Sequence, residues 1–163
     1  MSTTTAEAIR DRIITVVAAL TPTSQAGTPF RAYRNEGDAN LETWCEANPA
    51  QAFRRFQVRD TGADGAPDVS NTDVEQRTVQ YTLTVAYPQN NRTGKGAALD
   101  RDDVMRVDRL QIEKAIGMLG HANFTDPYPS ATWRFEDWDV SRSSGAGVDF
   151  TVVTVGFQFY LAR

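Results

Sequence analysis

The chain has 163 residues, 40% of them hydrophobic and 23% charged, a composition typical of one soluble globular domain. Its formal net charge of −4, from 17 basic and 21 acidic residues, lacks the strong basic excess of general nucleic-acid binders. One cysteine and one histidine exclude an intrachain disulfide, a cysteine-based zinc site and most other metal sites. No apolar run is long enough for a transmembrane helix and no secretory signal is visible, so we expect a single cytoplasm-made domain over residues 1–163.

The first expected element is an N-terminal helix. Thr4 and Glu7 fit a capping box, in which each side chain satisfies a free N–H group of the first turn. Apolar residues then recur at helical spacing until Thr21 and Pro22 end the run. This apolar stripe consists of Ile9, Ile13, Val16, Val17 and Leu20.

The next region is expected to hold two short strands, at about Phe30 to Arg34 and Ala52 to Arg59. Residues 35–51 between them give a weak pattern, with one helical turn near Leu41 to Cys45. The segment from Asp60 to Asp73 is rich in turn-forming residues and holds no large apolar side chain, so we expect an exposed loop.

The second half carries the clearest patterns. Apolar residues alternate with polar or small ones from Val79 to Tyr87, which predicts a half-buried strand. A helix is expected to begin at Asp100, with a stripe that includes Met105, Ile112, Ile116 and Leu119, and to end near Gly117 and Gly120. Two further strands, at about 131–141 and 148–161, are expected around a turn at 143–147. A change of phase between Phe135 and Trp138 indicates a β-bulge.

These elements occur in the order α-β-β-β-α-β-β. Two helices on one face of a mainly antiparallel sheet of about five strands would bury every apolar stripe described above. We therefore expect an α+β fold.

One local pattern resembles a metal site but is incomplete. Asp60, Asp64 and Gly65 are similar to part of a calcium-binding loop. Gly62 and Asn71, however, stand at positions where such a loop needs ligands. An exposed loop without calcium is the better interpretation.

The candidates for catalysis are equally incomplete. Asp137 and Asp139 alternate on one strand, as a magnesium-binding pair can, but no nearby His or Lys completes a catalytic set. We expect His121 to stabilise the end of the second helix, and Cys45 to pack as a partly buried small apolar residue. We therefore expect no enzymatic activity, no cofactor and no bound metal.

The strongest signal is one of interaction. The stretch from Asp60 to Glu75 is acidic and contains no basic residue, whereas arginines lie directly before and after it. An acidic stretch flanked by arginines can contact a neighbouring copy of the chain. It can also form a negatively charged rim around a passage for DNA. A solvated loop is the simpler alternative. The candidate residues for a subunit interface, partner interface or lumen are Arg54, Arg55, Arg59, Asp60, Asp64, Asp68, Asp73, Glu75 and Arg77.

The whole-chain pattern also resembles a known family. The features that carry it are a short N-terminal helix, a turn-rich loop before the Thr78 to Tyr87 strand, and three stretches: Phe30-Arg31-Ala32-Tyr33-Arg34, Asp100-Arg101-Asp102-Asp103 and Phe157-Gln158-Phe159-Tyr160-Leu161. In element order, size and texture, over nearly the full length, the chain resembles the tail terminator (tail completion) proteins of long-tailed bacteriophages. No sharp motif accompanies this resemblance.

Members of that family are small α+β subunits of a six-fold ring. The ring caps the growing tail tube, stops its polymerisation and offers the surface to which a filled head attaches. The resemblance therefore implies a structural virion protein at the head-tail junction, which forms a homohexameric ring. Its partners would be further copies of itself, the tail tube protein and the head-tail connector protein. DNA would be only cargo passing through the lumen, and no membrane would be involved.

The segment from Asn35 to Gln51, which contains Trp44, is longer than the connection expected between the first two strands. Head-tail connector or neck proteins of the same viruses, acting as stoppers or adaptors, share this size and texture and are the first alternative. A small α+β enzyme or ligand-binding domain is the second. A pocket with convergent titratable groups would favour that class.

Overall fold

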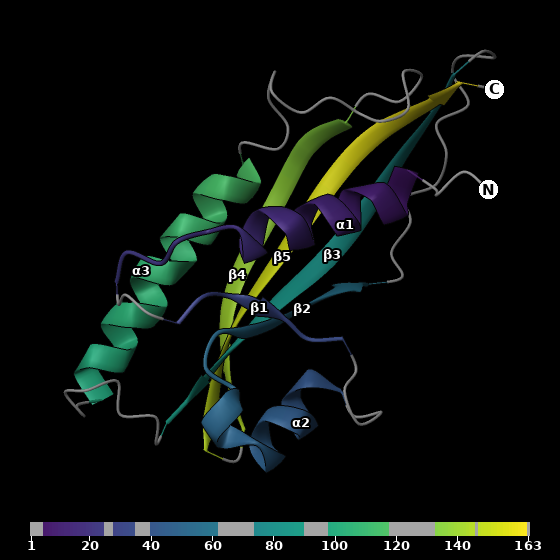
Figure 1. Cartoon of the computed structure of the whole chain (residues 1–163). Helices are drawn as coiled ribbons and strands as arrows, with labels where there is room; N and C mark the ends of the chain where they lie inside the picture. The colour runs from purple at the N-terminus through teal and green to yellow at the C-terminus, as the bar shows by residue number, and fades with distance from the viewer. Residues whose placement is uncertain are drawn as a thin grey trace.

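The computed structural model describes residues 5–24, 28–34, 40–61, 74–89, 98–117, 133–145 and 147–162. These residues form an α+β fold, shown in Figure 1. In chain order the elements are α1 (Thr5–Ala18), β1 (Arg31–Ala32), α2 (Leu41–Ala47), the 3₁₀ turn η2 (Pro49–Gln51), β2 (Arg55–Asp60), β3 (Val74–Pro88), α3 (Ala98–Gly117), β4 (Trp133–Gly145) and β5 (Val148–Ala162).

The five strands form one sheet in the order β1-β2-β3-β5-β4. All neighbours are antiparallel except β1 and β2, which run parallel, so the sheet is mixed. The expected order α-β-β-β-α-β-β is therefore wrong at one place, because α2 lies between the first two strands. A parallel pair needs a crossover connection, and the segment that contains α2 and η2 supplies it.

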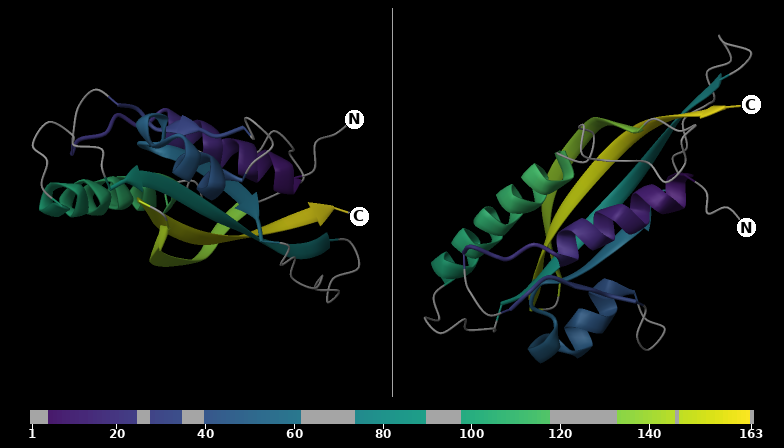
Figure 2. Two further views of the ribbon diagram at one scale, coloured as in Figure 1. Left: turned by 90° about the horizontal axis from the view of Figure 1, so that it is seen from below. Right: turned by 45° about the horizontal axis from the view of Figure 1, so that its top comes forward.

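Two helices, α1 and α3, pack on one face of the sheet, as the sequence predicts. Figure 2 shows the strongly twisted strands with α1 and α3 lying against them. The apolar stripe of α1 and alternate residues of β3 and β5 belong to one buried cluster with α3. Its helix members are Ile9, Ile13, Val17, Val104, Met105, Ile112 and Ile116, and its β3 members are Val79, Tyr81, Leu83, Val85 and Tyr87.

The third helix, α2, packs on the opposite face of the sheet. Its buried residues Leu41 and Cys45 belong to a second cluster with Ala86 and Phe150. Ala86 alternates along β3 with the residues under α1 and α3, so its side chain points the other way. In Figure 1, α2 lies at the end of the sheet where β3 ends and β5 begins.

Local capping explains why a helix as short as α2 forms. The Asn40 side chain accepts a hydrogen bond from the Thr43 N–H at 2.8 Å, which satisfies one free donor of the first turn. At the other end, the Asn48 N–H donates to the Trp44 carbonyl at 2.9 Å. The sequence pattern predicted one helical turn here, and caps together with packing extend it to seven residues.

The strands β3 and β5 extend beyond the rest of the sheet. They pair over 15 residues each, from Val74 opposite Ala162 to Pro88 opposite Val148. The β2 register covers only the part of β3 from Val85 to Tyr81. On the side of β3 that faces β2, no described strand pairs with residues 74–80, and Figure 1 shows this end projecting past β2.

The closing hairpin confirms two details of the sequence pattern. The register of β4 shifts between Phe135 and Asp137, where the change of phase indicates a bulge. The turn lies between Gly145 and Val148, within the expected segment, and β4 continues to Gly145 past its expected end at Ser141, whereas β5 begins at Val148 as expected. Gly147 has φ 78°, a conformation that glycine adopts without the steric cost borne by other residues.

Candidate functional site

The turn that leads into β2 sends two adjacent arginines to opposite faces of the sheet. Arg54 has φ 59°, in the left-handed region that residues other than glycine rarely adopt. Its N–H donates to the Ala86 carbonyl at 2.9 Å, and its carbonyl accepts from the Arg31 N–H at 3.1 Å. These bonds to β3 and β1 hold the strained residue in place. The Arg54 side chain therefore enters the core, whereas Arg55 lies on the face that α2 covers.

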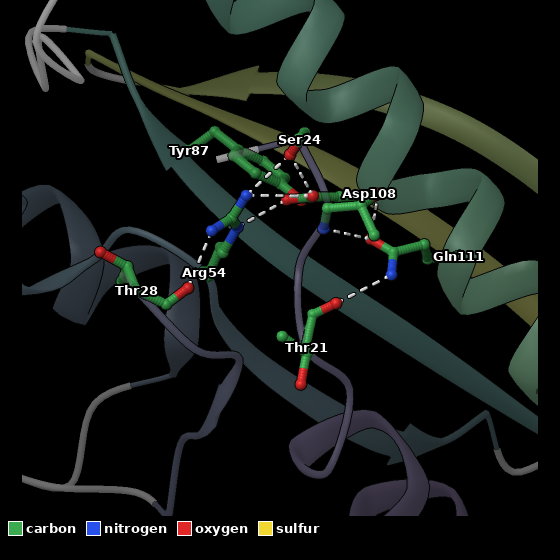
Figure 3. A network of polar contacts seen from close by, with 8 residues as sticks. Thr21, Ser24, Thr28, Arg54, Tyr87, Asp108 and Gln111 are labelled. Atoms are coloured by element: carbon green, nitrogen blue, oxygen red, sulfur yellow. Dashed lines mark hydrogen bonds and ion pairs between the residues drawn. The ribbon is translucent and has the colours of Figure 1, made fainter. Parts of the chain in front are cut away.

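Arg54 forms a buried ion pair with Asp108 of α3 (Figure 3). The Arg54 Nε donates to Asp108 Oδ2 at 2.7 Å and its Nη2 donates to Oδ1 at 3.1 Å, and both side chains are fully buried. The Tyr87 hydroxyl donates to Oδ2 at 2.9 Å, and the Ser24 hydroxyl donates to Oδ1 at 2.7 Å. Both carboxylate oxygens thus have two donors each, which compensates for their removal from water.

The rest of the guanidinium group is also satisfied. Its Nη1 donates to the Thr28 carbonyl at 2.8 Å, and its Nη2 donates to the Ser24 hydroxyl at 2.8 Å. The Arg54 guanidinium carbon lies 4.9 Å from the centre of the Phe53 ring and 5.5 Å from that of Phe30. Charge pairing, hydrogen bonds and aromatic contacts together make this buried pair tolerable.

The network holds the segment that connects α1 to β1 against α3. Gln111 of α3 accepts from the Thr23 N–H at 3.0 Å and donates to the Thr21 carbonyl at 3.0 Å. Together with the bonds from Arg54 and Asp108, these contacts fasten the segment after α1 to α3. Burial, followed by the nearby Asp108 charge, raises the pKa of Tyr87 well above its ordinary value, so its hydroxyl stays a donor.

This geometry corrects one part of the sequence interpretation. Arg54 was expected among the arginines that flank the acidic stretch and meet a partner, but its side chain is fully buried and bound within the chain. Its neighbour Arg55 lies on the other face, where its guanidinium carbon is 5.1 Å from the centre of the Trp44 ring. The Trp44 ring in turn lies 5.4 Å from Tyr33, and Arg55 also donates to the Ala32 carbonyl at 3.4 Å.

Two further candidates lie along β2. Arg59 forms an exposed ion pair with Glu42 of α2 at 3.4 Å, and its Nε donates to Gln57 at 2.9 Å. Asp60 is exposed at the last position of the strand. The structure thus brings Arg55, Arg59 and Asp60 onto one strand near the edge of the sheet.

The remaining candidates are separated from that group. Glu75 and Arg77 lie on the projecting part of β3, where their backbones pair with Leu161 and Phe159 of β5. Asp64, Asp68 and Asp73 lie outside the described residues. A shared interface for the whole set stays a prediction.

The other residues considered for catalysis are Cys45, His121, Asp137 and Asp139. Cys45 is fully buried, and burial together with the negative charge of Glu42 raises the pKa of its thiol to about 12. It is therefore a thiol rather than a thiolate at neutral pH. It packs as a small apolar residue, as the sequence predicts, but it is fully buried where partial burial was expected. His121 lies outside the described residues, as do the side chains of Asp137 and Asp139.

Among the described residues, no group of three or more His, Cys, Asp or Glu side chains is placed to hold a metal ion. No helix in this part of the chain is long and apolar enough to cross a membrane.

The sequence interpretation missed Asp108, Tyr87 and Ser24. One signal for Asp108 was present: it stands at helical spacing between Met105 and Ile112 on the apolar stripe of α3. A charged residue on a buried stripe needs a partner of opposite charge, because an unpaired charge in the core is very costly. The position of that partner, in a turn before a distant strand, had no local signal.

Comparison with known proteins gives no further guide to this network or to the sheet edges. No family model matches the chain, and no curated protein matches it.

Proposed function

We propose that this chain is a structural virion protein of a long-tailed bacteriophage, in which it forms a ring on the end of the tail tube. The ring ends tube polymerisation and provides the surface to which the head attaches. It acts by shape and not by catalysis, and its partners are further copies of itself, the tail tube protein and the head-tail connector protein. It is assembled in the host cytoplasm.

The observation that carries the proposal is the extension of β3 and β5 beyond β2. Gln80 accepts a hydrogen bond from the Thr61 N–H, so its backbone groups face the β2 side. By alternation, the backbone groups of Gln76 and Thr78 face the same side, where no described strand pairs with them. Backbone groups that the described strands leave unpaired can pair with a strand from another chain.

A ring subunit also needs two different contact surfaces, one for each neighbour. The projecting end of β3 is one available surface, and the opposite edge of the sheet at β4 is another. The resemblance in element order to the tail terminator family selects this kind of assembly among the possible ones.

The interior polar network gives secondary support. Arg54, Asp108 and Tyr87 are the residues that a catalytic site would use, but they are buried and bind one another. Their arrangement stabilises the fold and offers no access to a substrate. A protein that works through its surfaces is consistent with this use of its polar residues.

The direct test is negative-stain electron microscopy of lysates from a phage that lacks this gene. Overlong tails of variable length, beside filled heads without tails, are expected. The wild-type gene supplied in trans is expected to restore normal particles. Tails of normal length beside heads that have lost their DNA would instead indicate a connector or stopper and would contradict the proposal.

A backbone variant sharpens this test. Gln76→Pro removes an N–H that faces the open side of β3 and leaves the pairing with β5 intact. It is expected to give a folded protein that fails to complement the deletion. Gln76→Ala keeps the N–H and is the matched control, which should complement. Equal complementation by both variants would show that strand pairing at this edge is not needed.

A further inference from the structure

We infer that the edge formed by β1 and β2 is where a second copy of this chain docks its acidic segment 62–73. We call this surface the arginine edge, and it consists of Arg31, Arg34, Arg55 and Arg59. The inference rests on the proposed function, because it takes the partner to be another subunit, and it names the contact between them.

The first argument is an excess of like charge on the arginine edge. Arg31 of β1 lies directly opposite Arg55 of β2 in the parallel register, an arrangement that is unfavourable for two cations. Arg55 is shielded by the Trp44 ring and the Ala32 carbonyl. Arg59 is paired with Glu42 at 3.4 Å, but this pair is partly exposed and therefore weak.

The other two arginines supply charge for a partner. Arg31 and Arg34 are exposed, and no described residue forms an ion pair with either of them. A guanidinium group presents a planar array of donors that matches a carboxylate with two parallel hydrogen bonds. An acidic protein segment is therefore a suitable occupant.

The chain itself contains such a segment. Between Asp60 and Glu75 there is no basic residue, and Asp64, Asp68 and Asp73 are spaced along the stretch. Three carboxylates distributed in this way can meet several guanidinium groups along an edge.

The places where segment 62–73 joins β2 and β3 indicate that the arginine edge binds the segment of a second copy and not that of its own chain. The segment leaves β2 after Thr61, level with Gln80 of β3, and rejoins the sheet at Val74. The arginine edge begins at the other end of β2, near Val85. At about 3.3 Å per residue, these attachment points lie roughly 17 Å and 36 Å along β3 from that level. Arg31 and Arg55 are thus distant from both attachment points in their own chain, whereas a neighbour docked head-to-tail, as a ring requires, can place its segment beside them.

Two charge-reversal variants test this contact. The first, Arg31→Glu with Arg34→Glu, reverses the edge, and the second, Asp64→Lys with Asp68→Lys, reverses the segment. Association is measured by sedimentation velocity over a range of protein concentrations at low and at high salt. Wild-type protein is expected to associate, more weakly at high salt, and each variant alone is expected to associate at least tenfold more weakly.

An equimolar mixture of the two variants is the decisive sample. In the mixture each reversed edge meets a reversed segment and each native edge meets a native segment, so association is expected to return to the wild-type level. Arg10→Glu with Arg106→Glu changes the net charge as much as the first variant, at exposed sites away from the edge, and should associate like the wild type. Circular dichroism and thermal unfolding confirm that each variant is folded.

Three results would overturn the inference. They are association of the single variants at the wild-type level, failure of the mixture to recover, and a wild-type chain that stays monomeric at every concentration. Retention of duplex DNA by the wild type, lost in Arg31→Glu with Arg34→Glu while self-association is unchanged, would identify a phosphate-binding surface instead and would also overturn it.

The phage deletion separates the two proposals. If the mixture fails to recover but the deletion gives overlong tails, the proposed function stands and this contact is wrong. If the mixture recovers but tails of the deletion phage have normal length, the contact is real and the ring has a different role.

Discussion

Arg54 and Arg55 are neighbours in sequence but belong to two different regions of the molecule. Arg54 enters the core under α3, where each nitrogen of its guanidinium group has a hydrogen-bond partner. Arg55 lies under α2 on the other face, where its contacts include the Trp44 ring and the Ala32 carbonyl at 3.4 Å. The same kind of side chain is thus fully buried against a carboxylate in one region and packed at the margin of the sheet in the other.

The difference shows that burial determines how much a charged contact contributes to the free energy of unfolding. In the core, the pair with Asp108 is strong but removal of one partner leaves the other without solvent or counter-ion. At the edge, water can replace any partner that is lost, so single changes have small effects on stability. The core arginine therefore serves the fold, whereas the exposed Arg31 and Arg34 form no ion pair with a described residue.

Removal of the core carboxylate should give the largest effect. Asp108→Ala leaves the buried Arg54 without its counter-ion and should lower the free energy of unfolding by about 3–5 kcal/mol. Urea unfolding followed by tryptophan fluorescence measures it. Asp103→Ala, on the exposed side of the same helix, is the control and should change stability by less than about 0.5 kcal/mol. Equal effects of the two changes would disprove the distinction between core and surface.

Loss of the tyrosine hydroxyl should have a smaller effect in the same region. Tyr87→Phe removes one of the four hydrogen bonds to the Asp108 carboxylate and should cost about 1.5–2 kcal/mol. A double-mutant cycle with Asp108→Asn checks the cause, since the hydroxyl should matter less once the acceptor is uncharged. Additive effects would mean that the Tyr87 hydroxyl acts independently of Asp108.

Alkaline pH should weaken the two regions through different groups. The pKa of Cys45 is raised by burial from 9.0 to about 12, so the unfolded chain loses this proton first and stability falls as pH rises from 9 towards 12. The loss should reach about 1.4 kcal/mol at pH 10. Cys45→Ala should remove this part of the decline. The raised pKa of Tyr87 has the same sign but acts only above pH 10, and Tyr87→Phe should remove it.

Change at the edge arginine should be milder. Arg55→Ala removes the contact with the Trp44 ring and should cost about 0.5–1 kcal/mol in unfolding free energy. Arg55→Met keeps most of the aliphatic stem and separates the effect of packing from that of charge. A loss as large as that of Asp108→Ala would mean that the outer face is as tightly coupled as the core.

The smallest effect is expected at the exposed ion pair. Arg59→Ala breaks the contact with Glu42 and should change the free energy of unfolding by less than about 0.5 kcal/mol, with no difference left at high salt. Chemical unfolding at two salt concentrations provides the measurement. A larger, salt-independent loss would show that this pair fixes α2 to the sheet.

The sequence was informative wherever one face of an element is buried. The helical stripe from Ile9 to Val17 and the alternation from Val79 to Tyr87 predict α1 and most of β3, because periodicity records burial. The first residues of β3, including Glu75 and Arg77, carry no such pattern. Pairing with β5 makes them a strand, and a sequence pattern contains no information about a partner some 80 residues away.

The same reason explains the errors at the site. A two-residue strand such as β1 has no period, so its parallel pairing with β2 had no signal. Arg54 and Arg55 were assigned to one surface because both precede an acidic segment. Their separation depends on a single positive φ at Arg54 and on an aspartate 54 residues later.

The positive φ of Arg54 also constrains which substitutions the chain can accumulate. Gly or Asn at position 54 would relieve the backbone but leave Asp108 without its counter-ion in the core. Replacement of Asp108 first would leave the arginine in the same condition. Either order of single changes passes through a less stable intermediate, so replacement of one residue favours replacement of the other. Related chains are expected to keep both residues or to have replaced both.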